Sequence, residues 1–395
     1  MNLLHIIDTF SPVTGGPPEA VRQLVKAYIA IGGHVEIVTL DNSAEAFLRD
    51  IACPLHTLDQ TYLGRYAFSP RLWNWLHENA ERFDGMIMNG LWSFPGVALR
   101  HAALRARKPY GVFAHGALDP WFNRQYPLKH LKKQLYWPVQ HAVLRDASAV
   151  FFTSQAERDL ARSSFRSANW NSIVVPYGIT DPMASWPESD SLFEEFYRAL
   201  PALRERHFLL FLARIHAKKG CDLLLEAFAK VAPLAPDVDI VMAGPDQEGL
   251  EASLKSFTER LGIANRVHWP GLIDGKVKWG ALMACDAFVL PSHQENFGIS
   301  VVEALSVGRP VLISDQVNIW PEIEADGVGL VEHDTREGTE RLLRRWFDLS
   351  QSGRNAMAVR ARPCFLARFE MSHTASMIRN FFSSLKNGKK VEPKT

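Results

Sequence analysis

Short apolar runs alternate with longer segments in which apolar residues recur at helical spacing. In the first half of the chain such runs predict strands at 3–7, 35–40, 85–88, 110–113, 149–153 and 173–175. Helical patterns lie between them, as at 19–31, 72–82 and 128–144. Strands that alternate with helices in this way are typical of βαβ units, in which a parallel sheet is covered on both faces.

The alternation stops at 184–205, where prolines and acidic residues gather, and this segment predicts a linker with a short helix at 192–200. A second alternation then predicts strands at 207–212, 239–243, 267–269, 287–290, 310–313 and 328–331. Its helices are predicted at 221–231, 250–261, 277–285, 299–306 and 335–349. We therefore expect two Rossmann-like, doubly wound α/β domains that bind ligands at the carboxyl ends of their strands.

These patterns set the expected domain boundaries. The N-terminal domain is expected to span 1–183 and the C-terminal domain 206–366. A further helix is predicted at 367–385, followed by a basic, polar tail at 386–395 that is expected to be disordered.

Composition narrows the class of protein. The chain has 395 residues, which suits two domains, and its net charge of +1 gives no overall case for nucleic-acid binding. The four cysteines are far apart in sequence and form no CxxC pair, which favours a reduced compartment and no zinc site. The N-terminal apolar run is too short for a signal peptide, and no apolar stretch is long enough to span a membrane. A cytoplasmic protein is expected.

The segment from Ala287 to Ser314 carries the strongest chemical signal. It predicts strand, loop, helix and strand, with Gly298 where the helix begins. Amides at a helix start are unpaired and favour an anion, but an ordinary βα turn would contain the same glycine. Glu295 in the loop, and Glu303 within the apolar helix, favour a functional site instead. A buried carboxylate needs partners, and the hydroxyls of a ribose could supply them.

The sequence Glu295-Asn-Phe-Gly-Ile-Ser-Val-Val-Glu303 resembles the E-x7-E motif of glycosyltransferase family 4, the group 1 glycosyltransferases. That family has the two-domain GT-B fold and transfers sugars with retention at the anomeric carbon. Its last helix commonly crosses back to the first domain, so the resemblance implies that the helix predicted at 367–385 packs on the N-terminal domain. The resemblance implies that Glu295 contacts hydroxyls of the donor sugar and that Glu303 binds the ribose of the nucleotide. It also implies that the diphosphate or sugar is held around Asn296, Phe297, Gly298 and Ile299.

A cluster of cations follows the predicted strand 207–212. A run of charges is often only a solvated surface, but Arg214 and Lys219-Gly220 resemble the R-x4-KG element of the same family. The resemblance gives both cations a catalytic role, in which they neutralise the departing nucleoside diphosphate. Two further strand exits resemble the family's nucleotide contacts, and they contain Gly244 and Leu272.

The first half has weaker candidates. Gly15 and Gly16 follow the first strand and resemble the family's glycine-rich loop near the donor phosphate, whereas no GxGxxG pattern supports a dinucleotide site. His115 matches the family's His-Gly position beside the transferred sugar and is a catalytic candidate. Asp119 and Trp121 are acceptor candidates.

Two details of this half remain open. Asp119 as a general base would suit an inverting enzyme, which the overall resemblance argues against. The family often has Asn-Gly before the linker, but Tyr177 stands in the place of the Asn, so the role of that Asn is in doubt.

Residues 121–145 contain five Lys or Arg residues, five Trp, Tyr or Phe residues, and no acid. Such a segment can lie on an anionic membrane, and it can equally be a solvated helix that packs its aromatic rings inward. Nucleic acid is the weaker alternative, because no nucleic-acid motif accompanies the segment.

The resemblance implies a hexosyltransferase that moves a sugar from a UDP- or GDP-sugar to a glycan or polyprenyl-diphosphate-linked acceptor. Surface polysaccharide or lipopolysaccharide biosynthesis is the expected setting, with no metal and no cofactor, in the cytoplasm or on the inner face of the membrane. The alternatives are a GT-B epimerase of UDP-sugars and a catalytically inactive GT-B scaffold.

Overall fold

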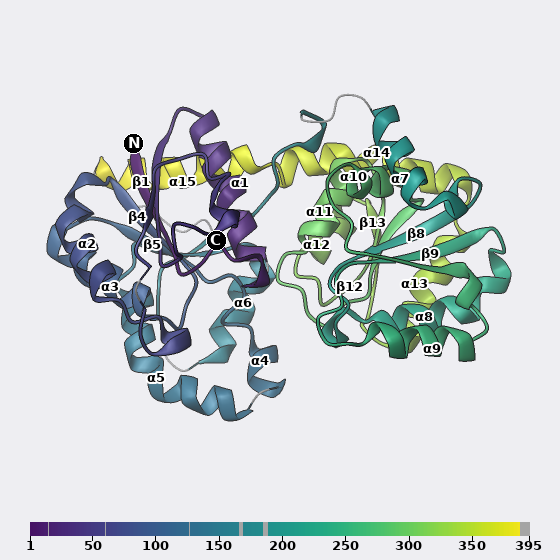
Figure 1. The fold of residues 1–395 in the computed structure, drawn as a ribbon, viewed down its shortest axis with the longest axis horizontal. Coiled ribbons are helices and arrows are strands. Elements are labelled where there is room, and N and C mark those ends of the chain that lie inside the picture. The colour runs from purple at the N-terminus through teal and green to yellow at the C-terminus, as the bar shows by residue number, and fades with distance from the viewer. Residues whose placement is uncertain (15, 60, 126, 166–168, 185–188, 388–395) are drawn as a thin grey trace. The chain divides into compact units, whose positions relative to one another are not determined.

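The structure is a computed structural model that describes residues 1–14, 16–59, 61–125, 127–165, 169–184 and 189–387 (Figure 1). It divides into two compact units. Unit 1 contains Met1–Thr180 and Glu370–Thr395, and unit 2 contains Asp181–Phe369. The sequence predicts a disordered tail at 386–395. Residues 388–395 of this tail lie outside the described part of the chain.

Unit 1 is built on a seven-stranded parallel sheet with the order β3-β2-β1-β4-β5-β6-β7. Its strands are β1 (Asn2–Ile7), β2 (His34–Thr39), β3 (Leu55–Thr57), β4 (Gly85–Asn89), β5 (Tyr110–Phe113), β6 (Ala149–Phe152) and β7 (Ser172–Val174). Strand β3 has only three residues, all of them half-buried, and so lacks the apolar run by which the other strands were predicted.

The helices of unit 1 are α1 (Gly16–Ala30), α2 (Pro70–Asn79), α3 (Phe94–Ala106), α4 (Pro120–Gln125), α5 (Pro127–Arg145), α6 (Gln155–Ser164) and α15 (Met371–Lys386). Helices α2, α3 and α5 share one buried cluster with the side chains of the central strands. The C-terminal helix α15 covers another part of the sheet, where the Phe382 ring fills the space beside Gly85 and Arg379 donates to the Ile31 carbonyl at 2.8 Å.

Unit 2 is built on a six-stranded parallel sheet with the order β10-β9-β8-β11-β12-β13. Its strands are β8 (His207–Leu212), β9 (Val238–Ala243), β10 (Val267–Gly271), β11 (Ala287–Leu290), β12 (Val311–Ser314) and β13 (Gly329–Glu332). Its helices are α7 (Ser189–Ala199), α8 (Cys221–Val231), α9 (Glu251–Arg260), α10 (Gly275–Ala284), α11 (Ile299–Ser306), α12 (Trp320–Ala325), α13 (Arg336–Asp348) and α14 (Gln351–Arg368). Both sheets are parallel and doubly wound, so the predicted fold class is confirmed.

The division of the chain differs from the predicted boundaries. Helix α7 lies within the predicted linker at 184–205, yet Leu192 and Phe196 on it are fully buried. They pack on α10 at Gly280, where a Cβ atom would lie 2.1 Å from the Leu192 carbonyl oxygen. The chain therefore changes unit at residues 180–181 and 369–370. The helix predicted at 192–200 is therefore present as α7, but it is part of unit 2 and not of a linker.

Candidate active site

The strand order of unit 2 brings two loops together. Strands β8 and β11 are neighbours, and from them the strand order runs in opposite directions to the two edges of the sheet. Doubly wound sheets bind ligands at this point of reversal, beyond the carboxyl ends of the two strands. The backbone N–H of His293, after β11, donates to the carbonyl of Lys218, after β8, at 2.8 Å. Gly220 has φ +67°, and a Cβ atom there would lie 2.1 Å from the Pro291 carbonyl oxygen. Only glycine allows this approach.

Lys219 and Glu295 form an ion pair between these loops. The Lys219 ammonium donates to Glu295 Oε2, and the side chains are only 7% and 20% exposed. Burial alone would raise the pKa of Glu295, but Lys219, with Lys218 and Arg214 farther away, outweighs this effect and lowers that pKa below its usual range. Glu295 is therefore a carboxylate at neutral pH, which suits orientation of hydroxyl groups and not donation of a proton.

Arg214 lies on the same loop after β8 and is half-buried. Its guanidinium donates to Gln247 Oε1 at 2.9 Å. A guanidinium has five N–H donors, so this bond leaves Arg214 able to bind an anion. Together with the two lysines it makes the β8 exit cationic.

Gly298 marks the start of helix α11. Its φ of +79° is left-handed, and as the N-cap residue it has no side chain to cap the helix. The Val301 and Val302 N–H groups donate to the Gly298 carbonyl at 2.9 and 3.2 Å, so the amides of Ile299 and Ser300 are the ones that a ligand could use. Phe297 packs its ring edge-on against Phe369 at 6.0 Å, so its side chain belongs to the core and only its backbone can face a ligand. Asn296 and Ile299, on either side, are half-buried.

Glu303 lies on the second turn of α11, with its side chain 14% exposed. The structure provides a partner that the sequence analysis missed, since Lys278 Nζ on α10 donates to Glu303 Oε1 at 2.9 Å. In the sequence, Lys278 stands between Val277 and Trp279 in a largely apolar helix. This interruption of the apolar pattern could have indicated that Lys278 has a partner.

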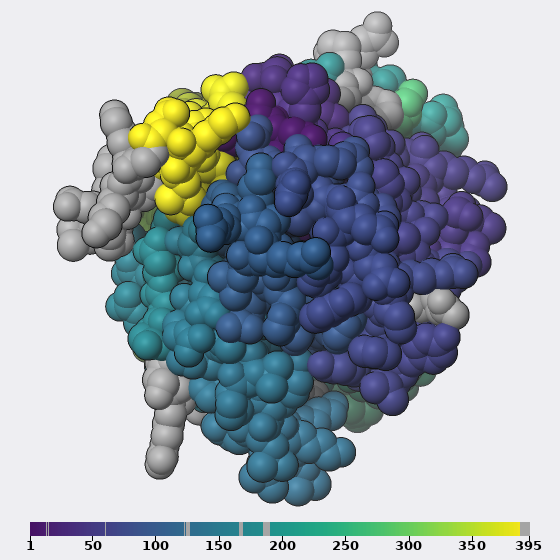
Figure 2. Space-filling view, turned by 90° about the vertical axis from the view of Figure 1, so that its left-hand side faces the viewer, coloured from purple at the N-terminus to yellow at the C-terminus, as the bar shows by residue number. Residues whose placement is uncertain are grey.

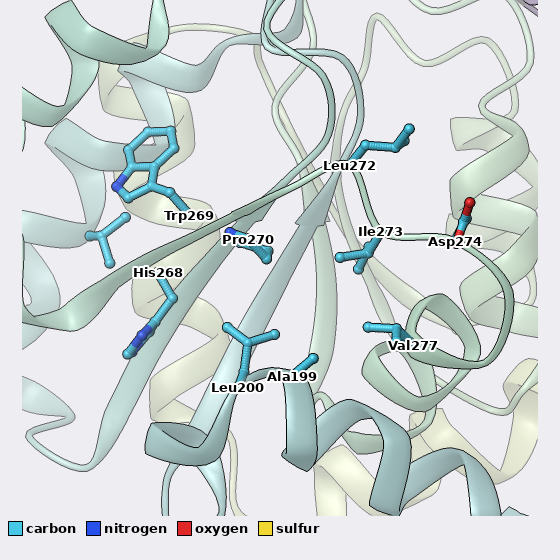
Figure 3. A pocket seen from close by; sticks show the side chains of 10 residues that line it. Ala199, Leu200, His268, Trp269, Pro270, Leu272, Ile273, Asp274 and Val277 are labelled. Atoms are coloured by element: carbon cyan, nitrogen blue, oxygen red, sulfur yellow. The ribbon is translucent and has the colours of Figure 1, made fainter.

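Gly244 and Leu272 lie toward the edge of the sheet. Gly244 has φ +144°, and a Cβ atom there would lie 1.8 Å from the Ala213 carbonyl oxygen, so the β9 exit packs directly on the β8 exit. Its N–H donates to the Gly271 carbonyl at 2.8 Å. Leu272 is 67% exposed and lines a cavity of about 600 Å³ beside β10, the end of α7 and the start of α10 (Figure 3). The structure thus places Gly244 against the cationic loop and Leu272 two strands away from it.

His115 lies at the β5 exit of unit 1, with φ +48°, which is uncommon for a residue other than glycine. Its ring stacks on Phe113 at 5.6 Å and on Tyr177 at 5.4 Å. Burial, with a smaller contribution from His5, lowers the pKa of His115 to about 3, so the imidazole is neutral. Its Nε2 atom is shielded from solvent and has no hydrogen-bond partner within the described part of the chain.

Glu157, which the sequence analysis also missed, holds the turn after His115. Its carboxylate accepts from the Gly116 N–H at 2.7 Å and from the Thr153 N–H at 2.6 Å. Asp119 is buried and accepts from the Trp121 N–H at 2.8 Å, and therefore holds the start of α4. Trp121 itself is half-buried.

The predicted site residues fall into two sets. Unit 2 holds the cations, the two glutamates and the Gly298 turn, and unit 1 holds His115, Asp119 and Trp121. Gly16 is exposed as the first residue of α1, and Gly15 lies outside the described residues. Within the described ranges, no group of three His, Cys, Asp or Glu residues is placed to hold a metal ion. The four cysteines are free thiols.

Two doubly wound units, one of them with a cationic sheet edge, define a two-domain α/β protein of the GT-B class, and solved structures agree with this class. Anabaena Alr3699/HepE in complex with UDP and glucose has a TM-score of 0.76 and 20% identity over 97% of this chain and 100% of that one. WaaG, a glycosyltransferase involved in lipopolysaccharide biosynthesis, has a TM-score of 0.69 and 16% identity over 96% of this chain and 99% of that one.

Family models identify the group within that class. The model "Glycosyl transferase 4-like domain" matches residues 15–178, and "Glycosyl transferases group 1" matches residues 193–362. The chain belongs to the group 1 glycosyltransferases. It is 28% identical to D-rhamnosyltransferase WbpZ of Pseudomonas aeruginosa over 93% of each chain. It is also 29% identical to the lipopolysaccharide core biosynthesis mannosyltransferase LpsB of Rhizobium meliloti, over 39% of this chain and 43% of LpsB.

Proposed function

We propose that the protein transfers a sugar from a nucleoside-diphosphate sugar to a hydroxyl group of a glycan or lipid-linked acceptor, in the synthesis of a surface polysaccharide or lipopolysaccharide. The observation that carries the proposal is the buried Lys219–Glu295 pair between the β8 and β11 exits, beside Arg214 and the uncapped start of α11. WbpZ and LpsB, which are named as sugar transferases, and the UDP and UDP-glucose complexes of Alr3699/HepE support it.

Each group has a role in this proposal. Arg214 and Lys219 neutralise the diphosphate, and the amides at Gly298 bind the phosphate or the sugar. Glu295, held as a carboxylate, accepts hydrogen bonds from sugar hydroxyls. Glu303 binds the ribose diol, and Lys278 holds its carboxylate in place. Gly244 and Leu272 complete the nucleotide side, Leu272 from the cavity beside β10.

The proposed reaction retains the anomeric configuration. The bond from the anomeric carbon to the diphosphate oxygen breaks as the acceptor hydroxyl attacks on the same face, and a phosphate oxygen takes the hydroxyl proton. The charge that develops on the diphosphate is stabilised by Arg214 and Lys219. Neither a metal nor a cofactor takes part in the proposal.

The residues of unit 1 serve the sugar and the acceptor. His115 is neutral, so its Nε2 atom can form a hydrogen bond with a sugar hydroxyl without adding charge. Asp119 is occupied at the start of α4, which favours a positioning role on the acceptor side over that of a general base. We place Trp121 beside it, and Gly15 and Gly16 near the donor phosphate.

A screen of sugar nucleotides by thermal shift tests the donor. A ligand at 100 times its Kd adds about 2.7 kcal/mol to the free energy of unfolding. We expect one UDP- or GDP-sugar to raise the melting midpoint, and Lys219→Ala and Arg214→Ala to remove the shift. Lys276→Ala is the matched control, because Lys276 is exposed on α10. If no sugar nucleotide binds, the chain is a scaffold and the proposal is wrong.

Product analysis tests the reaction. We expect a glycoside with the anomeric configuration of the donor. An epimerised free sugar nucleotide would indicate an epimerase. A glycoside with inverted configuration would contradict the proposed retaining mechanism but would still agree with sugar transfer.

We also propose that the protein works in the cytoplasm at the inner face of the membrane, where a polyprenyl-diphosphate-linked acceptor would be available. No helix of the described residues has the length and apolar character to cross a bilayer. Contact would therefore be made by a surface of the protein.

A further inference from the structure

Helix α5 of unit 1 exposes a row of aliphatic side chains. Leu128 and Leu135 are each 79% exposed, Leu131 is 60% exposed and Val139 is 43% exposed. They follow one another at intervals of three, four and four residues, which places them on one side of a helix. Isolated exposed leucines are ordinary, but a continuous apolar row on a surface indicates an interaction site.

The Trp137 side chain of the same helix faces the core. Trp137 is buried and stacks on Phe165 with ring centroids 4.3 Å apart, and Lys133 lies 4.7 Å above the Trp92 ring. The sequence pattern suggested aromatic rings at a lipid surface or packed inward. For Trp137 the second alternative is confirmed, and the residues left at the surface are aliphatic.

A loop distant in sequence lies beside this helix. The Tyr66 and Tyr136 rings meet edge-to-face at 5.7 Å, and their hydroxyl oxygens are 3.2 Å apart. The loop is closed by backbone hydrogen bonds between Tyr62 and Phe68 of 2.7 and 3.0 Å. Next to Tyr62, Leu63 is 73% exposed with a left-handed φ of +64°. A side chain this apolar, held outward at a cost in backbone strain, indicates a partner there.

The part of the sequence that contains the exposed row has an excess of basic residues. Lys129 and Lys132 are exposed on α5. The segment from Phe94 to Asp146 contains nine Lys or Arg residues and only two acids, although the whole chain has 44 basic and 43 acidic residues. Both acids of the segment are engaged, since Asp119 accepts from the Trp121 N–H and Asp146 is paired with Arg100 and Arg145.

We propose that this surface docks on an anionic lipid bilayer. The docking face consists of Leu128, Leu131, Leu135 and Val139 with Lys129 and Lys132 on the same helix, and Leu63 of the adjoining loop would extend it. Helix α5 would lie in the plane of the interface, with its aliphatic row among the acyl chains and its lysines at the headgroups. In Figure 2 the α4–α5 region stands out at the lower edge of the face shown.

A protein partner fits this face less well. The cores of protein interfaces are enriched in aromatic residues and arginine and depleted in lysine, whereas the docking face is aliphatic and flanked by lysine. An anionic lipid surface also matches the excess of basic residues in this segment. This proposal rests on the proposed function in one respect, because the membrane contact would bring the protein to a lipid-linked acceptor.

Sedimentation of the full chain with vesicles of phosphatidylglycerol or of phosphatidylcholine tests the proposal. We expect binding to phosphatidylglycerol vesicles that weakens as salt is added. A lysine near an anionic surface contributes about fivefold to partitioning, so K129Q/K132Q should bind these vesicles about 25-fold more weakly. L131S/L135S should lose at least about tenfold, because two leucines leave the acyl region. Val359→Ser is the matched control, since Val359 is 75% exposed on α14.

Equal binding to both lipids, or unchanged binding of L131S/L135S, would overturn the proposal. So would a dimer by light scattering that L131S/L135S dissociates, since the face would then be a contact between copies of the chain. All variants change exposed residues and should keep the melting midpoint of the parent. Donor binding without vesicles should also be unchanged, so failure of the lipid contact and failure of the proposed function are separate results.

Discussion

Replacing Lys219 by methionine tests the buried ion pair at the centre of the site. Methionine keeps most of the length and volume of the lysine side chain but removes its charge. Because Lys219 is only 7% exposed, the substitution leaves Glu295, itself 20% exposed, without its main partner. We expect K219M to lower both the stability of unit 2 and the affinity for the donor.

The magnitude follows from the burial of the two side chains. Removal of one partner from a buried ion pair costs about 3–5 kcal/mol, because a desolvated charge is left behind. Glu295 keeps some solvent and the weaker attraction of Lys218 and Arg214, so the lower end applies, about 3 kcal/mol. E295Q should also destabilise, whereas K219M/E295Q should recover about 2 kcal/mol, since no unpaired charge remains.

Native-state hydrogen exchange at the amides of β8 and β11 measures this effect within unit 2. The double variant should be nearly as stable as the parent and still fail to bind the sugar nucleotide, which separates stability from binding. If K219M showed the parent's protection at both strands, the ion pair would not be a buried, coupled pair and our account of the Glu295 charge would be refuted.

Three other predictions follow from the structure. Gly244→Ala should lower the melting midpoint strongly, because its Cβ atom would meet a backbone oxygen at 1.8 Å, whereas Gly249→Ala, with left-handed φ but open space, should cost only about 1–2 kcal/mol. The folded chain holds His5 and His115 neutral, with pKa values of about 4 and 3, so the unfolded chain binds more protons below pH 6.5. Stability should therefore fall on acidification by up to about 1.4 kcal/mol per pH unit and histidine, and H115Q should show a smaller slope in thermal unfolding. Glu303→Gln should weaken binding of UDP about tenfold but leave pyrophosphate binding unchanged in calorimetry; equal losses for both would rule out a ribose contact.

The elements around the site were predicted well, because clear signals bound them. Strand β8 and helices α8 and α11 have the predicted limits, since apolar runs there end at glycines or at a break in periodicity. The short strand β3 was not predicted, because it has no fully buried residue and no long apolar run. Helix α7 was predicted at 192–200, but the proline-containing segment around it was interpreted as a linker.

Long-range partners could not be predicted from the sequence. Lys278 reaches Glu303 from another helix, and Glu157 reaches the turn after His115 from α6. No local pattern indicates either pairing, because it depends on how two helices pack on the sheet. The direction of the aromatic side chains on α5 was undetermined for the same reason, since the segment is apolar on more than one side.

The central claim is that unit 2 binds a nucleoside-diphosphate sugar through Arg214, Lys219 and the start of α11, and that the protein transfers the sugar. The most direct measurement is to incubate the parent and K219M/E295Q with the sugar nucleotide found by thermal shift and with lipid-linked acceptors, and to identify the products. We predict a glycoside from the parent and none from the stable double variant. Equal amounts of glycoside from both proteins would contradict the account.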